Sequence, residues 1–332
     1  FLFGTLFLLR DSQALSKAFR FITIPMILLA GITLVRHSFS GFSFAEVSGA
    51  SYPYFRNHVN YGALLVCCIP MVWLLYKQDK NRWWLPALLL MAVALYFSYS
   101  RGAWLALPLG ILAAWLLRKG WLLRIVTVTM VLVCLGFAWL VRDNNYLQFR
   151  PDYASTIYHA DLKDHMEATY SMKDLSTAER FYRWIAGWRM GEEHPLTGVG
   201  PNHFYPAYRS YTVEAFRTYV SDNPEHSTVH NYFLLLLSEQ GFPALVIFLL
   251  LVWTLFYYAQ RNYEQYADAG QRRLLQAVVA ILAMIMVLIS LSDLIEADKI
   301  GPLFYTCIAV VIAAGSGAYI KGVPEAVAEE IE

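Results

Sequence analysis

Repeated apolar runs, each close to the length that crosses a lipid bilayer, constrain this chain more than any other feature. A transmembrane helix needs roughly 17–25 mostly apolar residues. The 332-residue chain has about eight such runs and a partial one at its start, at residues 1–9, 21–35, 61–76, 83–99, 102–117, 122–141, 229–258, 274–291 and 302–320. A water-soluble domain cannot hide this much apolar surface, since 58% of the residues are hydrophobic. The sequence therefore predicts an all-α membrane protein built as a multi-span helical bundle.

Lysine and arginine are concentrated in alternate connections between these runs, which orients the chain. Connections rich in these residues usually face the cytoplasm, and here they lie at 10–20, 77–82, 118–124 and 261–273. The poorer connections, predicted to face outward, lie at 36–60, 98–101, 142–228 and 292–301. We therefore expect Arg101, the long loop 142–228 and an acidic turn at 293–298 on the outer side of the membrane.

The same pattern divides the chain into four parts. Residues 1–141 are expected to form the N-terminal part of the transmembrane bundle, 142–228 a large outer loop subdomain, 229–320 the C-terminal spans and 321–332 a cytoplasmic tail. The chain starts at Phe1, inside an apolar run and without methionine, so we expect further spans before it. All four cysteines lie in apolar runs and indicate no disulfide framework.

The outer loop 142–228 is far too long for a connector, and it mixes charges of both signs with many aromatic residues. It is therefore predicted to fold as a helical subdomain. Ser176 and Glu179 have the spacing of a capping box at a helix start, and Gly191 and Pro195 mark its end. One face of this helix carries Phe181, Trp184, Ile185 and Trp188. We expect such a helix to lie at the membrane interface or to cover the bundle.

Three arginines on the outer side are candidate phosphate ligands. Arg101 lies between two apolar runs, and Arg180 and Arg183 lie one turn apart on the loop helix. A guanidinium stays charged and matches the geometry of phosphate oxygens. The alternatives are that Arg101 extends to lipid headgroups and that Arg180 and Arg183 belong to a solvated or headgroup-facing stripe.

His230 stands where the outer loop becomes an apolar span, and a histidine is the usual acceptor of a hydroxyl proton near neutral pH. The alternative is a helix-capping or interfacial histidine. The other loop histidines have irregular spacings that do not predict a zinc site: they are His159, His165, His194, His203 and His226.

The acidic turn offers Asp293, Glu296 and Asp298. Its E-x-D spacing could hold a divalent cation, although ordinary outer-loop charge, with one carboxylate orienting an arginine, is the favoured interpretation. No charged residue is expected near the middle of any span. That expectation argues against a transporter, because transport sites normally lie at the membrane midplane.

Four motifs in this order resemble the O-antigen ligase and polymerase superfamily of bacterial envelope glycosyltransferases. S-R-G at 100–102 resembles the family's outward arginine, and R-F-Y-R-W at 180–184 its R-x-x-x-W helix. H-P-L-T-G-V-G-P-N-H-F at 194–204 is similar to its P-L-x-G-x-G turn. His230 and its neighbour Asn231 precede Gly241 by the family's spacing of H-[N/S/Q]-x9-G. Ala244 departs from the Gly, Thr or Tyr that the motif expects next.

The resemblance implies a GT-C-like glycosyltransferase of the bacterial inner membrane whose active site faces the periplasm. The donor would be a glycan on undecaprenyl diphosphate, and the acceptor a sugar hydroxyl of lipid A–core. Membrane lipid is an expected partner, nucleic acid is not, and neither metal nor another cofactor is expected. His230 would be the base, with Arg101 and Arg180 at the diphosphate. Substrate contacts are expected from Arg183, Trp184, Gly198, Gly200, Asn202, Asn231 and Glu296.

Related functions remain open from the sequence. A polysaccharide polymerase or a protein O-oligosaccharyltransferase would use the same donor with another acceptor. A protein of a different class, a non-catalytic transporter of lipid-linked glycans, would also carry a large outer loop. Single displacement at the anomeric carbon would make the transferase inverting.

Overall fold

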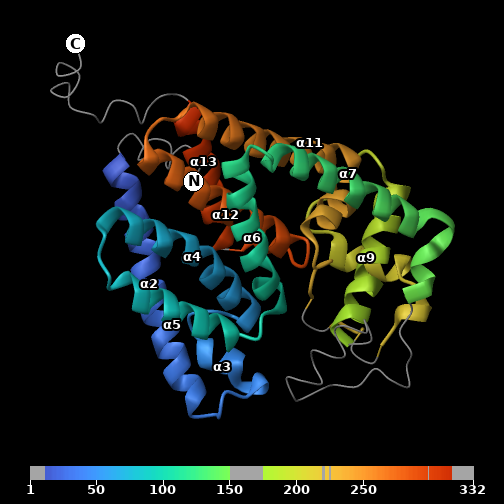
Figure 1. The fold of residues 1–332 in the computed structure, drawn as a ribbon. Helices are drawn as coiled ribbons and strands as arrows, with labels where there is room; N and C mark the ends of the chain where they lie inside the picture. Colours follow the sequence, from blue (N-terminus) through green and yellow to red (C-terminus); the bar gives the residue numbers. More distant parts are fainter. Residues whose placement is uncertain (1–11, 150–174, 219–220, 224–225, 298, 316–332) are drawn as a thin grey trace. The chain divides into compact units, whose positions relative to one another are not determined.

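The computed structural model describes residues 12–149, 175–218, 221–223, 226–297 and 299–315, which form helices joined by turns and loops, with no β-strand (Figure 1). The prediction of an all-α, multi-span protein is confirmed. The chain divides into two compact units. Within the described residues, the first unit takes in 12–123, 254–288 and 296–315, and the second takes in 124–253 and 289–295.

The first unit is a helical bundle, in which α4 contacts α2, α5 and α6. Its elements are α2 (Ser12–Ser38), η1 (Phe44–Glu46), α3 (Val47–Ser51), α4 (His58–Asp79), α5 (Trp84–Tyr96), α6 (Arg101–Lys119), α12 (Ala269–Ile289) and α13 (Ile300–Gly315), with the C-terminal part of α11 (Tyr232–Gln265). Gly110 lets α6 approach α12 closely, since a Cβ there would lie 2.5 Å from Met284 Cε. Asn262 of α11 donates to the Val311 carbonyl of α13 at 3.0 Å.

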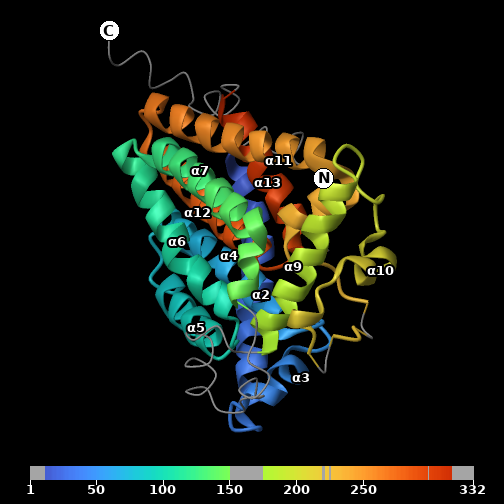
Figure 2. The ribbon, with the colours of Figure 1, turned by 90° about the vertical axis from the view of Figure 1, so that its right-hand side faces the viewer.

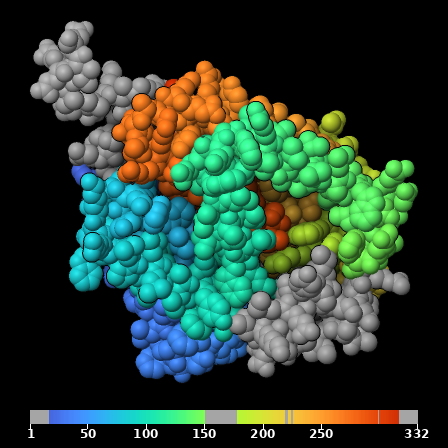
Figure 3. Space-filling view, in the orientation of Figure 1, coloured from blue at the N-terminus to red at the C-terminus, as the bar shows by residue number. Residues whose placement is uncertain are grey.

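Six helices are long and apolar enough to cross a membrane: α2, α4, α6, α7 (Leu122–Val141), α11 and α12. The helices α5 and α13 are apolar but shorter. Each span predicted from residue 21 onward falls on one of these eight helices, because an apolar run of this length forms a helix of similar length. Residues 1–9 and 316–320 of the predicted spans lie outside the described part. On the face shown in Figure 3, the outer surface of α7 is uncovered.

The second unit contains the described part of the outer loop. Its elements are most of α7, η2 (Arg142–Phe149), α9 (Leu175–Glu193), α10 (Phe204–Ala207), η3 (Tyr208–Tyr211), η4 (Glu214–Phe216), the N-terminal part of α11 and most of η5 (Leu294–Glu296). Helix α9 contacts η3 and η4, and Figure 2 shows it beside the start of α11. The core is formed by Tyr146, Tyr182, Ile185, Ala186, Met190, Phe204, Tyr208, Phe216, Val229, Leu234, Leu235 and Leu237.

The predicted apolar face of α9 is real, but protein covers it. Ile185 is buried in the core of the second unit, and Phe181, Trp184 and Trp188 pack against that core. Aromatic pairs line this face: Phe181 stacks on Phe149 with ring centroids 5.9 Å apart. Several loop aromatics thus stabilise the subdomain itself. Tyr153 and Tyr170, two other aromatic residues of the loop, lie outside the described residues.

The predicted capping box is wrong. Helix α9 already includes Leu175, so Ser176 does not stand at its N-cap. The Glu179 carboxylate is used elsewhere, accepting hydrogen bonds from the hydroxyls of Ser221, at 2.5 Å, and Thr218. The local pattern failed because two hydroxyls about forty residues further along the chain compete for the same carboxylate.

Candidate active site

His230 immediately precedes the cap of α11 in an unusual backbone conformation. Its φ is 54°, in the left-handed region that non-glycine residues rarely take. The Asn231 side chain caps the helix, accepting from the Leu234 N–H at 3.1 Å and donating to the Ser290 carbonyl at 2.9 Å. Such strain persists only where neighbouring contacts fix it, and it is common at functional sites.

The carboxylate of Asp293 lies close to the His230 ring. Its Oδ1 lies 3.9 Å from His230 Nδ1, and its Oδ2 accepts from the Thr228 hydroxyl at 2.7 Å. The Thr228 hydroxyl also receives the His230 N–H at 3.4 Å. A carboxylate beside Nδ1 favours the tautomer protonated there, which leaves the lone pair on Nε2. About 37% of the His230 side chain is exposed, so a substrate hydroxyl can reach it.

Burial, together with the positive charges of two arginines, keeps the His230 ring neutral. Its pKa is lowered from 6.5 to about 4. The largest cause is removal of the ring from water, and the positive charges of Arg183 and Arg180 act in the same direction, whereas Asp293 raises the pKa. The imidazole is therefore a free proton acceptor throughout the neutral range.

Two glycines of α9 bring the arginine helix close to His230. A Cβ on Gly187 would lie 3.0 Å from the side chain of Val229, the residue before the histidine. A Cβ on Gly191 would lie 2.5 Å from Leu237 Cγ in α11. Small residues four apart let two helices approach closely. The sequence G-W-R-M-G thus lets α9 pack closely enough for its arginines to act electrostatically on His230. The resemblance alone did not explain this spacing.

Arg183 is buried, with 9% of its side chain exposed. Its Nη2 lies 3.4 Å from Glu179 Oε2, while its Nε has no hydrogen-bond partner. The neighbouring Trp184 also has a buried indole N–H without a partner. A solvated stripe is therefore excluded for Arg183. Arg180 is half-buried, whereas Arg189 bonds Tyr146 and the Tyr211 carbonyl.

Helix α11 is interrupted at Gly241, where φ is 76° and ψ is −177°. In a continuous helix, the N–H of residue 242 would bond the Ser238 carbonyl and that of residue 243 the Glu239 carbonyl. Pro243 has no N–H, and the Phe242 N–H points elsewhere. The break therefore leaves two carbonyls and one N–H that need other partners.

The P-L-T-G-V-G turn supplies those partners. Pro195 accepts from the Phe242 N–H at 2.8 Å, while Val199 and Gly200 donate to the Ser238 and Glu239 carbonyls at 2.9 and 3.0 Å. The main-chain N–H of Gly200 is therefore already used within the protein. A direct role of this turn in substrate binding stays a prediction that rests on its other atoms.

The two motif glycines at this junction have little room for a side chain. At Gly198, with φ of 63°, a Cβ would lie 2.2 Å from the Glu239 carbonyl carbon. At Gly241 it would lie 2.6 Å from the Pro195 oxygen. The P-L-x-G-x-G turn and the glycine that follows the histidine motif therefore form one structural unit.

Glu239 corrects the expectation that no charged residue stands near the middle of a span. It lies within the predicted span 229–258, and its side chain is almost fully buried. Its Oε2 accepts from the Asn202 N–H at 2.8 Å and its Oε1 from the Phe204 N–H at 3.0 Å. A carboxylate inside an apolar run was the sequence signal that could have revealed it.

The remaining predicted residues are placed as follows. Arg101, the first residue of α6, and Glu296, the last of η5, belong to the first unit, so their predicted substrate contacts stay predictions. His194, His203 and His226 are exposed. His159, His165 and Asp298 lie outside the described residues.

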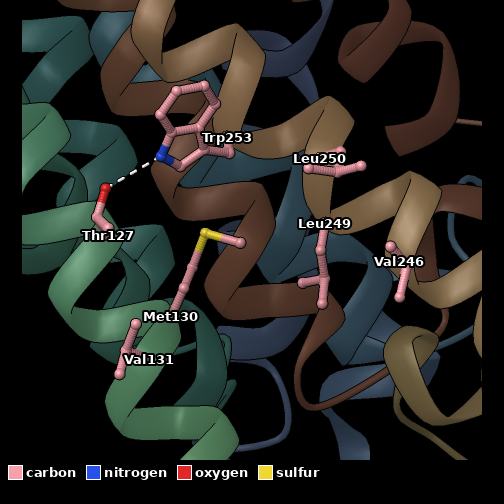
Figure 4. Close-up of a pocket in the computed structure, with 7 residues that line it drawn as sticks. All are labelled: Thr127, Met130, Val131, Val246, Leu249, Leu250 and Trp253. Carbon is pink, nitrogen blue, oxygen red and sulfur yellow. Dashed lines mark hydrogen bonds between the residues drawn. The ribbon is translucent and has the colours of Figure 1, made fainter.

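The second unit also holds an apolar cavity of about 400 Å³ between α7 and α11 (Figure 4). One polar contact crosses it, in which the Trp253 indole donates to the Thr127 hydroxyl at 3.0 Å. Figure 4 shows the residues that line it: Thr127, Met130, Val131, Val246, Leu249, Leu250 and Trp253.

Comparison with known proteins identifies the region that carries these motifs. No curated protein matches the chain at a significant level. Residues 86–249 match the family model described as O-Antigen ligase. This region includes Arg101, the arginines of α9, the glycine turn and His230. With its histidine, its arginine helix and its membrane-spanning helices, the chain carries a domain of the O-antigen ligase superfamily and is a membrane glycosyltransferase of the O-antigen ligase and polymerase type.

Proposed function

We propose that this protein transfers a glycan from undecaprenyl diphosphate to a hydroxyl of lipid A–core, at the periplasmic side of the inner membrane. The observation that carries the proposal is His230, a neutral and accessible imidazole near Asp293 and under the electrostatic influence of two arginines. The second unit thus holds both a proton acceptor, His230, and positive charges that can stabilise an anionic leaving group.

The reaction is a single displacement. The acceptor oxygen attacks the anomeric carbon while the bond from that carbon to the diphosphate oxygen breaks, so the configuration inverts. His230 Nε2 takes the hydroxyl proton, and Asp293 stabilises the resulting imidazolium. The diphosphate leaves with the bonding electron pair, and positive side chains stabilise its charge without a metal ion. Arg180 is proposed as the principal contact, with Arg183 beside it and Arg101 as the contact expected from the sequence.

Two features support a lipid-linked anionic donor. Arg183 is a buried cation whose Nη2 is paired with Glu179, but its Nε–H has no partner, and a buried donor is costly until an acceptor such as a phosphate oxygen meets it. The apolar cavity between α7 and α11 offers a hydrocarbon chain a surface without charge. The arginines would therefore hold the head of the donor and the spans its tail.

The proposed function is tested with protein purified in detergent, an undecaprenyl-diphosphate glycan and a lipid A–core acceptor. We expect transfer without added metal and no loss of activity in EDTA. Glu296→Ala is the matched variant, and it should keep the same metal response. A Mg²⁺ or Mn²⁺ requirement that disappears in Glu296→Ala would instead assign the acidic turn to a metal site. Transfer only to a second donor glycan would favour a polymerase, and transport without transfer would exclude both enzymes.

The proposed orientation can be measured independently of activity. Single cysteines at the exposed residues Glu214 and Lys119 should react with a membrane-impermeant maleimide from opposite sides. We expect Glu214→Cys to be labelled in intact spheroplasts and Lys119→Cys only after the membrane is opened. The background is a cysteine-free variant of the chain. Labelling of Glu214→Cys from the cytoplasmic side alone would contradict the proposed periplasmic active site.

A further inference from the structure

The half-helix of α11, defined as residues 232–240, is fixed at both ends. At its start, Asn231 caps the helix and bonds the Ser290 carbonyl. At its end, the break at Gly241 is filled by the turn at 195–200. His230 directly precedes the cap, so the position of the ring depends on where this half-helix lies.

Glu239 adds a charged contact to the second of these anchors. The residue is 7% exposed, and its two carboxylate oxygens accept hydrogen bonds from the backbone N–H groups of Asn202 and Phe204. At about 1.5 Å per helical residue, Glu239 lies about 14 Å along the axis from His230. It therefore acts on the histidine only through the half-helix.

The chemistry of this contact requires a carboxylate. Both partners are peptide N–H donors that cannot rotate, so two acceptor atoms are needed at one side chain. A glutamine of almost equal size offers one acceptor and one NH₂ group. Its NH₂ would face a second N–H donor, so the bond to either the buried Phe204 N–H or the part-buried Asn202 N–H would be lost. An aspartate keeps two acceptors but is one methylene shorter.

We propose that Glu239 is a positioning residue for His230, and that its carboxylate locks the half-helix to the turn at 195–204. This inference rests on the proposed function, because it gives the position of His230 a catalytic meaning. Misplacement of a reacting group by about 1 Å can lower a rate by about 10²-fold.

The test compares Glu239→Gln and Glu239→Asp with the wild type and with Ser238→Ala. Ser238 is the matched control, since it is the buried neighbour in the same half-helix and its hydroxyl donates to the Leu235 carbonyl within that helix. We expect kcat per folded molecule to fall by about 10–100-fold in Glu239→Gln and by less in Glu239→Asp. KM for the donor should change little, because the proposed diphosphate contacts lie on α9 and α6, outside the half-helix. Ser238→Ala should retain the wild-type kcat.

The pH profile separates positioning from mere folding. A half-helix that loosens lets His230 leave its partly buried, positive surroundings, so the acidic limb of the Glu239→Gln profile should move upward toward 6.5. If Glu239→Gln keeps the wild-type kcat and its acidic limb lies at the wild-type pH, the inference is overturned. It is also overturned if the variant yields less folded protein but each folded molecule keeps the wild-type kcat and acidic limb. If Glu239→Gln does not accumulate, Glu239→Asp decides in the same way. His230→Ala is measured alongside, and wild-type transfer there would sink the proposed function itself.

Discussion

Replacing His230 with alanine should lower the rate of glycan transfer by about 10²–10⁴-fold, the usual contribution of a general base. The protein should still fold and bind the lipid-linked donor, because the proposed diphosphate contacts are arginines, on α9 and at Arg101 of α6. Turnover and donor affinity are measured on the same detergent-purified sample. If donor binding falls in step with activity, His230 is a substrate contact, and the base must be sought among Asp293, Glu296 and the carboxylates of the loop.

A matched control exists for the backbone effect of this substitution. His226 lies in the same loop with nearly the same left-handed φ, 53° against 54° for His230. Its ring stacks on Tyr205 with centroids 4.0 Å apart and is exposed. His226→Ala therefore repeats the strain of an alanine at positive φ without removing the base, and it should retain most of the activity.

The same site predicts an unusual pH dependence. Because the pKa of His230 is lowered to about 4, the ring stays neutral as the pH falls, and it becomes protonated only near that value. The acidic limb of kcat/KM in the wild type should therefore lie well below 6.5. Arg183→Gln removes one cause of the lowering and should move this limb upward. Arg217→Gln, at an exposed arginine paired with Glu214, should leave it in place.

The sequence was informative where local patterns decide the structure. Apolar runs predicted the membrane helices, because a helix is the way a single segment satisfies its own backbone in lipid. The motif residues of α9 and His230 were predicted as candidates from type and order. The sequence could not show that Asp293 lies beside His230, since 63 positions separate them and no local pattern specifies that pairing.

The errors arose from contacts between distant segments. Glu179 matched a capping box, but Ser221 and Thr218 use its carboxylate. Gly198 and Gly200 belong to the predicted substrate-binding turn, and the sequence did not show that this turn also completes the broken helix α11; the substrate role itself stays a prediction. Glu239 was missed because an apolar run suggested lipid around it, and the turn that covers it lies about forty residues earlier. In each case, a contact with a distant segment gave the residue a structural role that the local pattern does not show.

Replacing Arg180 should have the second largest effect. If Arg180 stabilises the charge that develops on the diphosphate, Arg180→Ala should lower transfer by about 10²–10³-fold, or roughly 2.7–4 kcal/mol. Arg180→Lys keeps the charge but loses the planar pair of N–H donors, so it should recover only part of the rate. The same pair of substitutions at Arg101 tests the contact that the sequence predicts there.

A loss of transfer is easier to interpret in an Arg180 variant than in an Arg183 variant. Arg183 is buried against Glu179, so its removal leaves a buried carboxylate without its cation and destabilises the protein. Arg180 is half-buried, and the folded fraction of Arg180→Ala is measured together with its transfer rate. Arg217→Ala, at an exposed position, controls for a general change in charge. Near-normal transfer by Arg180→Ala and Arg101→Ala, at normal expression, would assign both arginines to the lipid headgroups and leave charge compensation to other groups.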